Sequence, residues 1–98
     1  MRIRYHRHAR AEVAKAARYF EDQAEGLGER FAAEIDRVVL DIADLPILWP
    51  ITKYGTRKRI LVEPFPYSIH YKFVNDEIFI IAVAHQSRHP EYWIDRLD

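Results

Sequence analysis

The sequence has no cysteine, only three glycines and a formal net charge of zero. Without cysteine, neither a disulfide framework nor a thiolate metal site can form. Three glycines leave no glycine-rich loop that could cradle a phosphate. No apolar run approaches the roughly 20 residues of a membrane-spanning helix, and the first residues hold no apolar signal-peptide segment. These absences predict a cytoplasmic protein without a membrane partner.

The charge that is present is arranged in blocks. Residues 1–18 carry six basic side chains and one acidic one, residues 21–44 carry eight acidic and two basic, and residues 53–59 carry four basic. A neutral total argues against a protein that coats nucleic acid, although a local basic patch remains possible. The alternative, solvated faces of opposite sign, is the more common origin of such blocks.

The N-terminal half predicts a short strand followed by two helices. Ile3 to Tyr5 alternates and fits an edge strand. Residues 9–25 are rich in Ala, Glu, Lys and Arg and predict a helix whose start lacks a Ser, Thr, Asp or Asn cap. Residues 26–28 predict a stop and a tight turn. The second predicted helix, 29–45, has one apolar stripe, which consists of Phe31, Ile35, Val38, Ile42 and Leu45. The short turn makes the two helices an antiparallel hairpin.

The C-terminal half predicts three strands and a short helix. Residues 46–50 form an apolar connector, in which we expect Trp49 to pack under the sheet. A strand begins near Arg57, the prolines at 64 and 66 end it, and residues 67–74 alternate. Asn75-Asp76 predicts a two-residue hairpin, and residues 78–83 are apolar on both faces. Pro90 would begin a terminal helix that reaches Leu97 and docks Trp93 and Leu97.

The predicted fold is therefore α+β. A short N-terminal strand and an antiparallel helical hairpin would pack on a C-terminal antiparallel β-meander with a short terminal helix. At 98 residues, the chain is expected to form a single domain, 1–98.

A cluster of chemically capable residues follows the most apolar predicted strand. His85 is followed within a few residues by Arg88, His89, Tyr92 and Trp93. Histidine exchanges protons near neutral pH, and arginine can clamp a phosphate or a carboxylate with two hydrogen bonds. An equally weighted alternative is structural, with His85 capping the strand end and Arg88 pairing with a helix carboxylate.

Further candidate sites lie elsewhere in the chain. The basic run from Lys53 to Arg59 could bind a phosphate backbone, or could be charge that discourages pairing at an exposed strand edge. His6 and His8, or His85 and His89, have spacings that metals use, but a third ligand is missing, so we expect no metal and no cofactor. Ser68 lacks the strand-turn-helix motif of a hydrolase nucleophile.

Several segments together resemble the RelE/ParE superfamily of bacterial type II toxin–antitoxin toxins, over nearly the whole chain. The similar segments are Tyr19-Phe20-Glu21, Gly26-Leu27-Gly28-x-x-Phe31, Arg59 followed by Phe65-Pro66-Tyr67-x-Ile69-x-Tyr71, and Ala82-Val83-x-His85-x-x-Arg88-x-Pro90-x-Tyr92-Trp93-x-x-Arg96. The resemblance implies the same hairpin-on-sheet fold, a cognate antitoxin as partner, and a role in modules that include plasmid stabilisation systems.

The superfamily divides by target. RelE-like members are metal-free, ribosome-dependent mRNA endoribonucleases (mRNA interferases), in which an Arg typically follows the aromatic residue that opens the middle strand. Here Ser68 follows Tyr67, which favours the ParE-like branch, whose members bind and inhibit DNA gyrase. The neutral net charge fits poorly with ribosome-directed relatives and favours the same branch.

The resemblance leaves three hypotheses, and whether the chain is an enzyme stays open. As a gyrase inhibitor, it would use residues 85–97 as part of its contact surface. As a ribonuclease acting on the ribosome with mRNA, it would use His85 or Tyr92 as acid or base, with Arg88 as a third catalytic residue. As a non-toxic relative, it would only bind antitoxin. Across the first two hypotheses, the expected target- or phosphate-binding residues are Lys58, Arg59, Arg88, Trp93 and Arg96.

Overall fold

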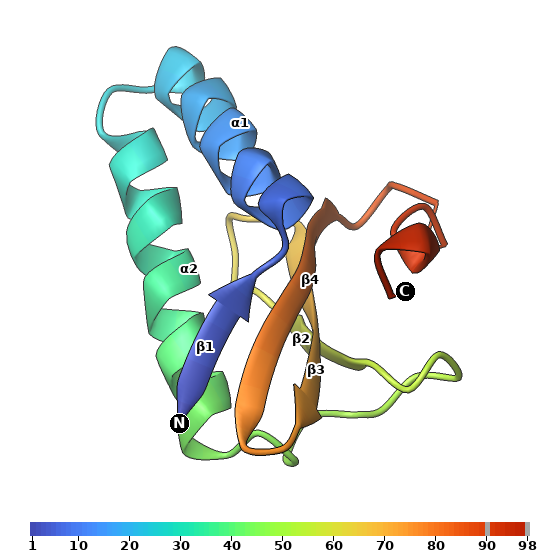
Figure 1. Ribbon diagram of the computed structural model, residues 1–98. Helices are drawn as coiled ribbons and strands as arrows, with labels where there is room; N and C mark the ends of the chain where they lie inside the picture. The colour runs from blue at the N-terminus through green and yellow to red at the C-terminus, as the bar shows by residue number, and fades with distance from the viewer. Residues whose placement is uncertain (90, 98) are drawn as a thin grey trace.

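The computed structural model describes residues 1–89 and 91–97. Its elements, in chain order, are β1 (Arg2–Tyr5), α1 (Arg7–Gln23), α2 (Leu27–Asp44), β2 (Arg57–Ile60), β3 (Tyr67–Val74), β4 (Glu77–His85) and a 3₁₀ helix (Ile94–Leu97). Figure 1 shows the two helices side by side on one face of the sheet and the C-terminal segment, residues 91–97, on the other. The predicted α+β class, helical hairpin and meander are confirmed.

The four strands form one mixed sheet in the order β1-β4-β3-β2. β2, β3 and β4 are antiparallel neighbours, whereas β1 pairs in parallel with β4, from Arg2 opposite Glu77 to Tyr5 opposite Ile80. Asn75 and Asp76 join β3 to β4 with φ angles of 53° and 60°, the left-handed values that a tight two-residue hairpin requires. The predicted hairpin is confirmed, and the parallel pairing is an addition to the prediction.

The turn between the helices lies two residues earlier than predicted, at residues 24–26. Gly26 has φ 82° and precedes α2, but Gly28 lies inside the first turn of the helix. A Cβ at Gly28 would collide with the carbonyl oxygen of Ala17, so glycine allows the helices to approach closely here. The backbone N–H groups of Gly26 and Gly28 both donate to the carboxylate of Glu21, at 2.9 and 3.0 Å, which fixes the turn to α1.

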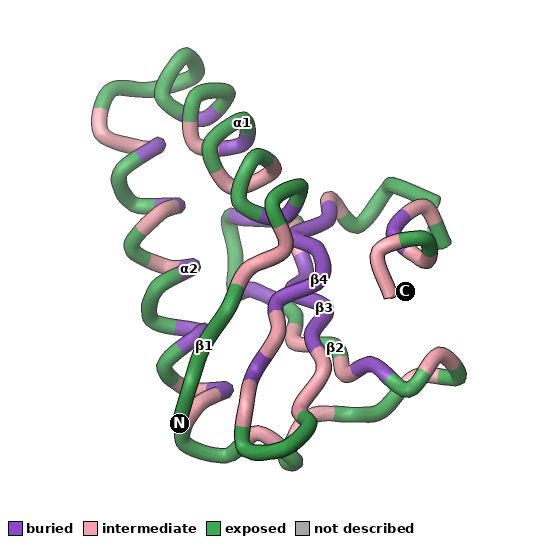
Figure 2. Tube along the Cα trace, viewed as in Figure 1, coloured by how far each residue is buried: buried purple, intermediate pink, exposed green. Residues whose placement is uncertain are grey.

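The predicted stripe on α2 is correct except at its end. Phe31, Ile35, Val38 and Ile42 are buried against the sheet, but Leu45 is 57% exposed because α2 ends at Asp44. Figure 2 shows the buried stretches on β3, β4 and the sides of the helices that face them, while β1 is exposed along most of its length. The main core therefore lies between the helical hairpin and the sheet.

β4 contributes to two apolar clusters, one on each face of the sheet, and a bulge interrupts its alternation. Tyr71 pairs with Ile80 and His70 pairs with Ala82, so that Ile81 is one residue extra. Ile80 belongs to the core beneath the helices, whereas Ile81 and Ala82 pack with Trp93 on the opposite face. This explains why residues 78–83 are apolar on both faces.

The terminal helix is shorter than predicted. Its regular part is a 3₁₀ turn over Ile94–Leu97, and Pro90, its predicted first residue, lies outside the residues that the structure describes. Trp93 is docked as expected, at 1% exposure, and Leu97 packs against its cluster. Within residues 1–89 and 91–97, none of the helices has the length and apolar content that crossing a bilayer requires.

Candidate functional site

Three of the predicted residues meet at one cavity. A hollow of about 580 Å³ opens between α1, the start of β3 and the end of β4, and His85, Arg88 and Tyr92 line it. α1 contributes Lys15 and Glu12 to the rim and wall. The remaining wall is largely aromatic, formed by Tyr19, Phe20 and Tyr67 together with two prolines, Pro64 and Pro66.

His85 is held at the end of β4 by its own loop. Its Nδ1 accepts a hydrogen bond from the backbone N–H of Ser87 at 3.0 Å and lies 2.7 Å from the hydroxyl of Ser87. Because Nδ1 accepts from a backbone donor, the proton of the neutral ring resides on Nε2. The ring also stands edge-on to Tyr67, with centroids 5.2 Å apart. The structural alternative for His85, a strand-end cap, is therefore realised in this geometry.

Arg88 does not adopt its predicted structural alternative. Instead of pairing with a helix carboxylate, the exposed guanidinium lies 3.8 Å above the ring of Tyr92. A cation over a tyrosine face is an attractive contact that leaves the N–H donors free at their edges. Arg88 is thus presented at the mouth of the cavity.

Glu12 of α1, which the sequence analysis did not single out, is the centre of the hydrogen-bond network. The hydroxyl of Tyr92 donates to it at 2.7 Å, and Arg96 donates to both of its oxygens, at 3.0 and 2.9 Å. The backbone N–H of Val83 adds a fourth bond at 2.9 Å. Burial acts to raise the pKa of Glu12, but the bonds from Arg96, Tyr92 and Val83 outweigh it and hold the pKa below its ordinary value.

Burial and the same network together raise the pKa of Tyr92, and the network occupies the guanidinium of Arg96. Burial, followed by the hydrogen bond to Glu12, raises the pKa of Tyr92 well above its ordinary value. Arg96 also donates to the carbonyl of Ile81 at 3.1 Å, and its side chain is only 12% exposed. Arg96 is therefore an internal ion-pair partner in this structure.

One sequence feature could have indicated Glu12: it is the only acidic residue among residues 1–18.

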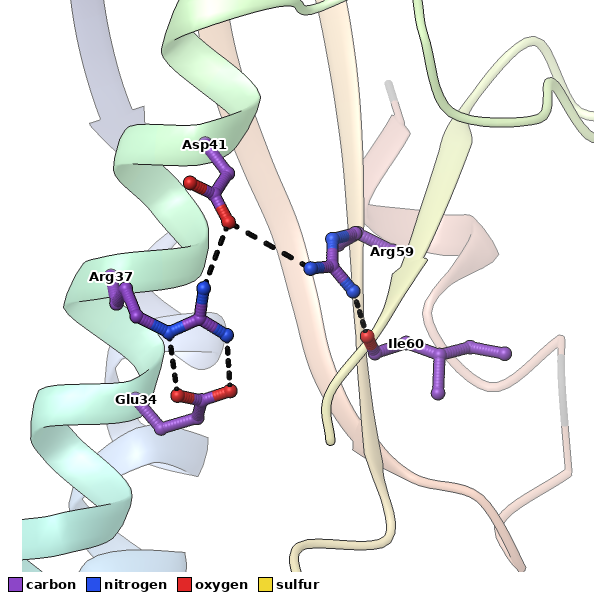
Figure 3. Close-up of polar contacts among 5 residues, drawn as sticks. All are labelled: Glu34, Arg37, Asp41, Arg59 and Ile60. Carbon is purple, nitrogen blue, oxygen red and sulfur yellow. Dashed lines mark hydrogen bonds and ion pairs between the residues drawn. The ribbon is translucent and has the colours of Figure 1, made fainter. Parts of the chain in front are cut away.

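Arg59 points toward the helices, away from the cavity. In Figure 3 its guanidinium reaches Asp41 of α2, 3.7 Å away, and donates to the carbonyl of Ile60. Arg37 completes the network with bonds to Asp41 and Glu34. The guanidinium of Arg59 also lies 4.4 Å from the ring centre of Trp49, which packs against the helix-side core and so confirms its place under the sheet.

Lys58 and Trp93 belong to the outer face of the sheet. Lys58 is exposed and pairs with His70 of β3, whose ring packs against that of Trp93 at 4.8 Å. Burial, and then the charge of Lys58, lowers the pKa of His70 to about 4. The structure thus gathers His85, Arg88, Tyr92 and Arg96 at one end of β4 and places Lys58 and Arg59 elsewhere. Over residues 1–89 and 91–97, no three His, Asp or Glu side chains come close enough to hold a metal ion.

The sequence matches the model of a known protein family. A model of the ParE toxin of the type II toxin–antitoxin system parDE matches residues 3–90. The chain belongs to this family. The match confirms the resemblance to the RelE/ParE superfamily and its ParE-like branch, and membership implies a cognate antitoxin as partner.

A solved structure shows the same fold. A chain of the chromosomal ParDE system from P. aeruginosa is 19% identical, with a TM-score of 0.61, and the similarity covers 87% of this chain and 95% of that one. A comparison with curated protein sequences gives no match. At this identity, the structural likeness establishes the ParE toxin fold and nothing about the target.

Proposed function

We propose that the chain acts as a toxin that binds and inhibits DNA gyrase, in the cytoplasm, through a target surface made of the cavity and its rim residues Lys15, His85, Arg88 and Tyr92. The observation that carries this proposal is Ser68. At the position where the ribonuclease branch presents an arginine, the chain has a serine that is 2% exposed. A buried serine cannot hold the phosphate of an RNA chain.

The contacts that the other basic side chains make within the protein also favour gyrase binding over RNA cleavage. Arg96 is paired with Glu12, and Arg59 is paired with Asp41 and the carbonyl of Ile60. A ribonuclease must stabilise the charge that develops on a phosphate, which requires donors aimed at one point. Here Lys58 and Arg88, the two exposed cations of the expected set, do not border the same cavity.

The target surface has the character of a protein-binding site. Its floor is aromatic, and Lys15 and Arg88 stand at its edge. Buried aromatic pockets with a charged rim are typical of the few residues that dominate protein–protein affinity. Trp93 and Arg96, which we expected to contact the target, would act in this proposal as supports beneath the surface.

A supercoiling assay tests the proposal. Purified chain, free of antitoxin, is expected to inhibit supercoiling of relaxed plasmid by purified gyrase, and Arg88→Ala should weaken inhibition about tenfold, the effect of losing about 1.4 kcal/mol of binding. Arg30→Ala is the matched control, since Arg30 is an exposed arginine on α2. Normal supercoiling at saturating concentrations of the chain would refute gyrase as the target.

One observation keeps the ribonuclease as a second candidate. His85, Arg88 and Tyr92 do converge on one cavity, as an acid–base set would. This candidate predicts growth arrest with normal plasmid supercoiling and with mRNA cut only on translating ribosomes. Expression of the chain without antitoxin in bacterial cells separates the third possibility, a non-toxic antitoxin-binding relative, because that chain would not arrest growth.

A further inference from the structure

The C-terminal segment, residues 91–97, is attached to the rest of the molecule mainly through side chains. Its backbone hydrogen bonds are local, from Tyr92 to His89, from Ile94 to Glu91 and from Arg96 to Trp93. None of these bonds extends the sheet. The attachment therefore rests on the apolar contacts of Trp93 and on the polar contacts of Tyr92 and Arg96, with an exposed ion pair between Glu91 and Lys53 at 3.9 Å in addition.

The burial of Trp93 against the sheet also buries polar atoms that lack hydrogen bonds. Beneath the segment, the buried polar atoms Ser68 Oγ, His70 Nδ1 and Trp93 Nε1 have no hydrogen-bond partner among residues 1–89 and 91–97. An unsatisfied buried polar atom costs free energy comparable to a lost hydrogen bond. These costs offset part of what burial of the indole contributes, so the segment depends on its polar contacts more than the burial of Trp93 suggests.

The polar contacts of Tyr92 and Arg96 fall on one carboxylate, except for the bond from Arg96 to the carbonyl of Ile81. Glu12 Oε1 accepts from Val83 and Arg96, and Oε2 accepts from Tyr92 and Arg96. The first partner lies on β4 and the other two on the C-terminal segment, so Glu12 joins α1, the sheet and the segment at one point. Arg88, stacked on Tyr92, is held in turn at the mouth of the cavity.

We propose that Glu12 is a positioning residue of the target surface. It fixes the C-terminal segment on the sheet and so places the ring of Tyr92, and Arg88 above that ring, where a partner can bind. This role rests on the proposed function, but the attachment of the segment can be measured without gyrase.

The chemistry of the site requires a carboxylate with two free acceptor oxygens. In Glu12→Gln, the amide nitrogen replaces one oxygen and directs its own N–H groups at Arg96, which can only donate, and at either the backbone N–H of Val83 or the hydroxyl of Tyr92. The N–H of Val83 can only donate, whereas the hydroxyl of Tyr92 can turn to accept. The substitution therefore breaks at least one bond from Arg96 and removes its charge partner, while it keeps the shape of the side chain. Glu12→Asp keeps the charge but is one methylene shorter.

Hydrogen exchange tests the attachment. In Glu12→Gln, backbone amides in residues 91–97 are expected to exchange at least about tenfold faster, while amides of α2 and β3 keep their rates. Glu29→Gln is the matched control, since Glu29 is an exposed glutamate in the first turn of α2. In a Trp49→Phe background, acrylamide should quench Trp93 more strongly in the Glu12→Gln variant. Unchanged exchange and quenching would overturn the proposal.

A double variant separates positioning from general stability. Glu12→Gln leaves the largely buried side chain of Arg96 without its charge partner, so adding Arg96→Met should restore the thermal midpoint. If Glu12 positions the surface, gyrase inhibition should remain weakened in this double variant although stability has recovered. Full recovery of inhibition would reduce Glu12 to a structural role. If the segment loosens but the unmodified chain leaves gyrase unaffected, the proposed target is wrong and the attachment by Glu12 stands.

Discussion

Protonation of His70 should destabilise the protein in a pH range where the carboxylates are still ionised. The imidazole is 7% exposed, packs against Trp93 and faces the charge of Lys58 on β2, while Glu12 acts on it weakly in the opposite direction. Burial is the main cause that lowers the pKa of His70 from 6.5 to about 4. The folded state therefore resists a proton that the unfolded chain accepts.

The sign and size follow from linkage. Above pH 6.5 both states hold a neutral ring, so His70 has no effect on stability there. As pH falls below 6.5 the unfolded chain binds the proton and the folded chain does not, so the free energy of unfolding decreases until pH reaches about 4. At about 1.36 kcal/mol per pH unit, the 1.5 units between pH 6.5 and pH 5 remove about 2 kcal/mol.

The assay is urea unfolding at pH 7.5 and pH 5 for the unmodified chain and for His70→Phe, which keeps an aromatic ring against Trp93. The unmodified chain should lose about 2 kcal/mol between these pH values, and His70→Phe should lose little. His89→Gln, at an exposed position, should retain the full loss. An equal loss in His70→Phe would refute the reasoning, because the decrease would then have another source.

Two further predictions concern packing. Gly28→Ala should destabilise the protein by about 2 kcal/mol, since the added Cβ meets the carbonyl of Ala17 and must separate the helices; an unchanged urea midpoint would show that the hairpin adjusts freely. Tyr71→Phe should cost about 1 kcal/mol, because the hydroxyl donates to the carbonyl of Pro46 at 2.7 Å; a thermal midpoint equal to that of the unmodified chain would mean that this bond contributes nothing.

Local patterns predict most of this fold. The α2 stripe and the Asn75-Asp76 turn each act within a few residues, and both were correct within the limits of helix-end assignment. The start of α1 was undefined because its cap is unusual: His6 Nδ1 accepts from the backbone of His8 in place of a Ser, Thr, Asp or Asn oxygen. The exposure of Leu45 was missed because periodicity does not tell where a helix leaves the core.

The site was harder to predict, because its central contact spans the chain. Glu12 and Arg96 lie 84 residues apart, and in sequence Glu12 looks like any glutamate on a solvated helix. The sequence did identify the side chains that reach the cavity, since His85, Arg88 and Tyr92 follow one strand end. It could not show that Arg59 is bound to α2, because that contact depends on which sheet face the residue occupies.

The parallel pairing of β1 decides where these distant residues meet. Tyr5 lies beside Ile80, so α1, which begins at Arg7, starts near the middle of β4 and runs over its end. Glu12 thereby reaches Val83, and the C-terminal segment, which leaves the same end of β4, brings Arg96 to it. An antiparallel β1 would deliver the start of α1 to the opposite end of β4, far from the segment. The proposed target surface therefore depends on the strand pairing of β1 with β4, which local sequence patterns did not predict.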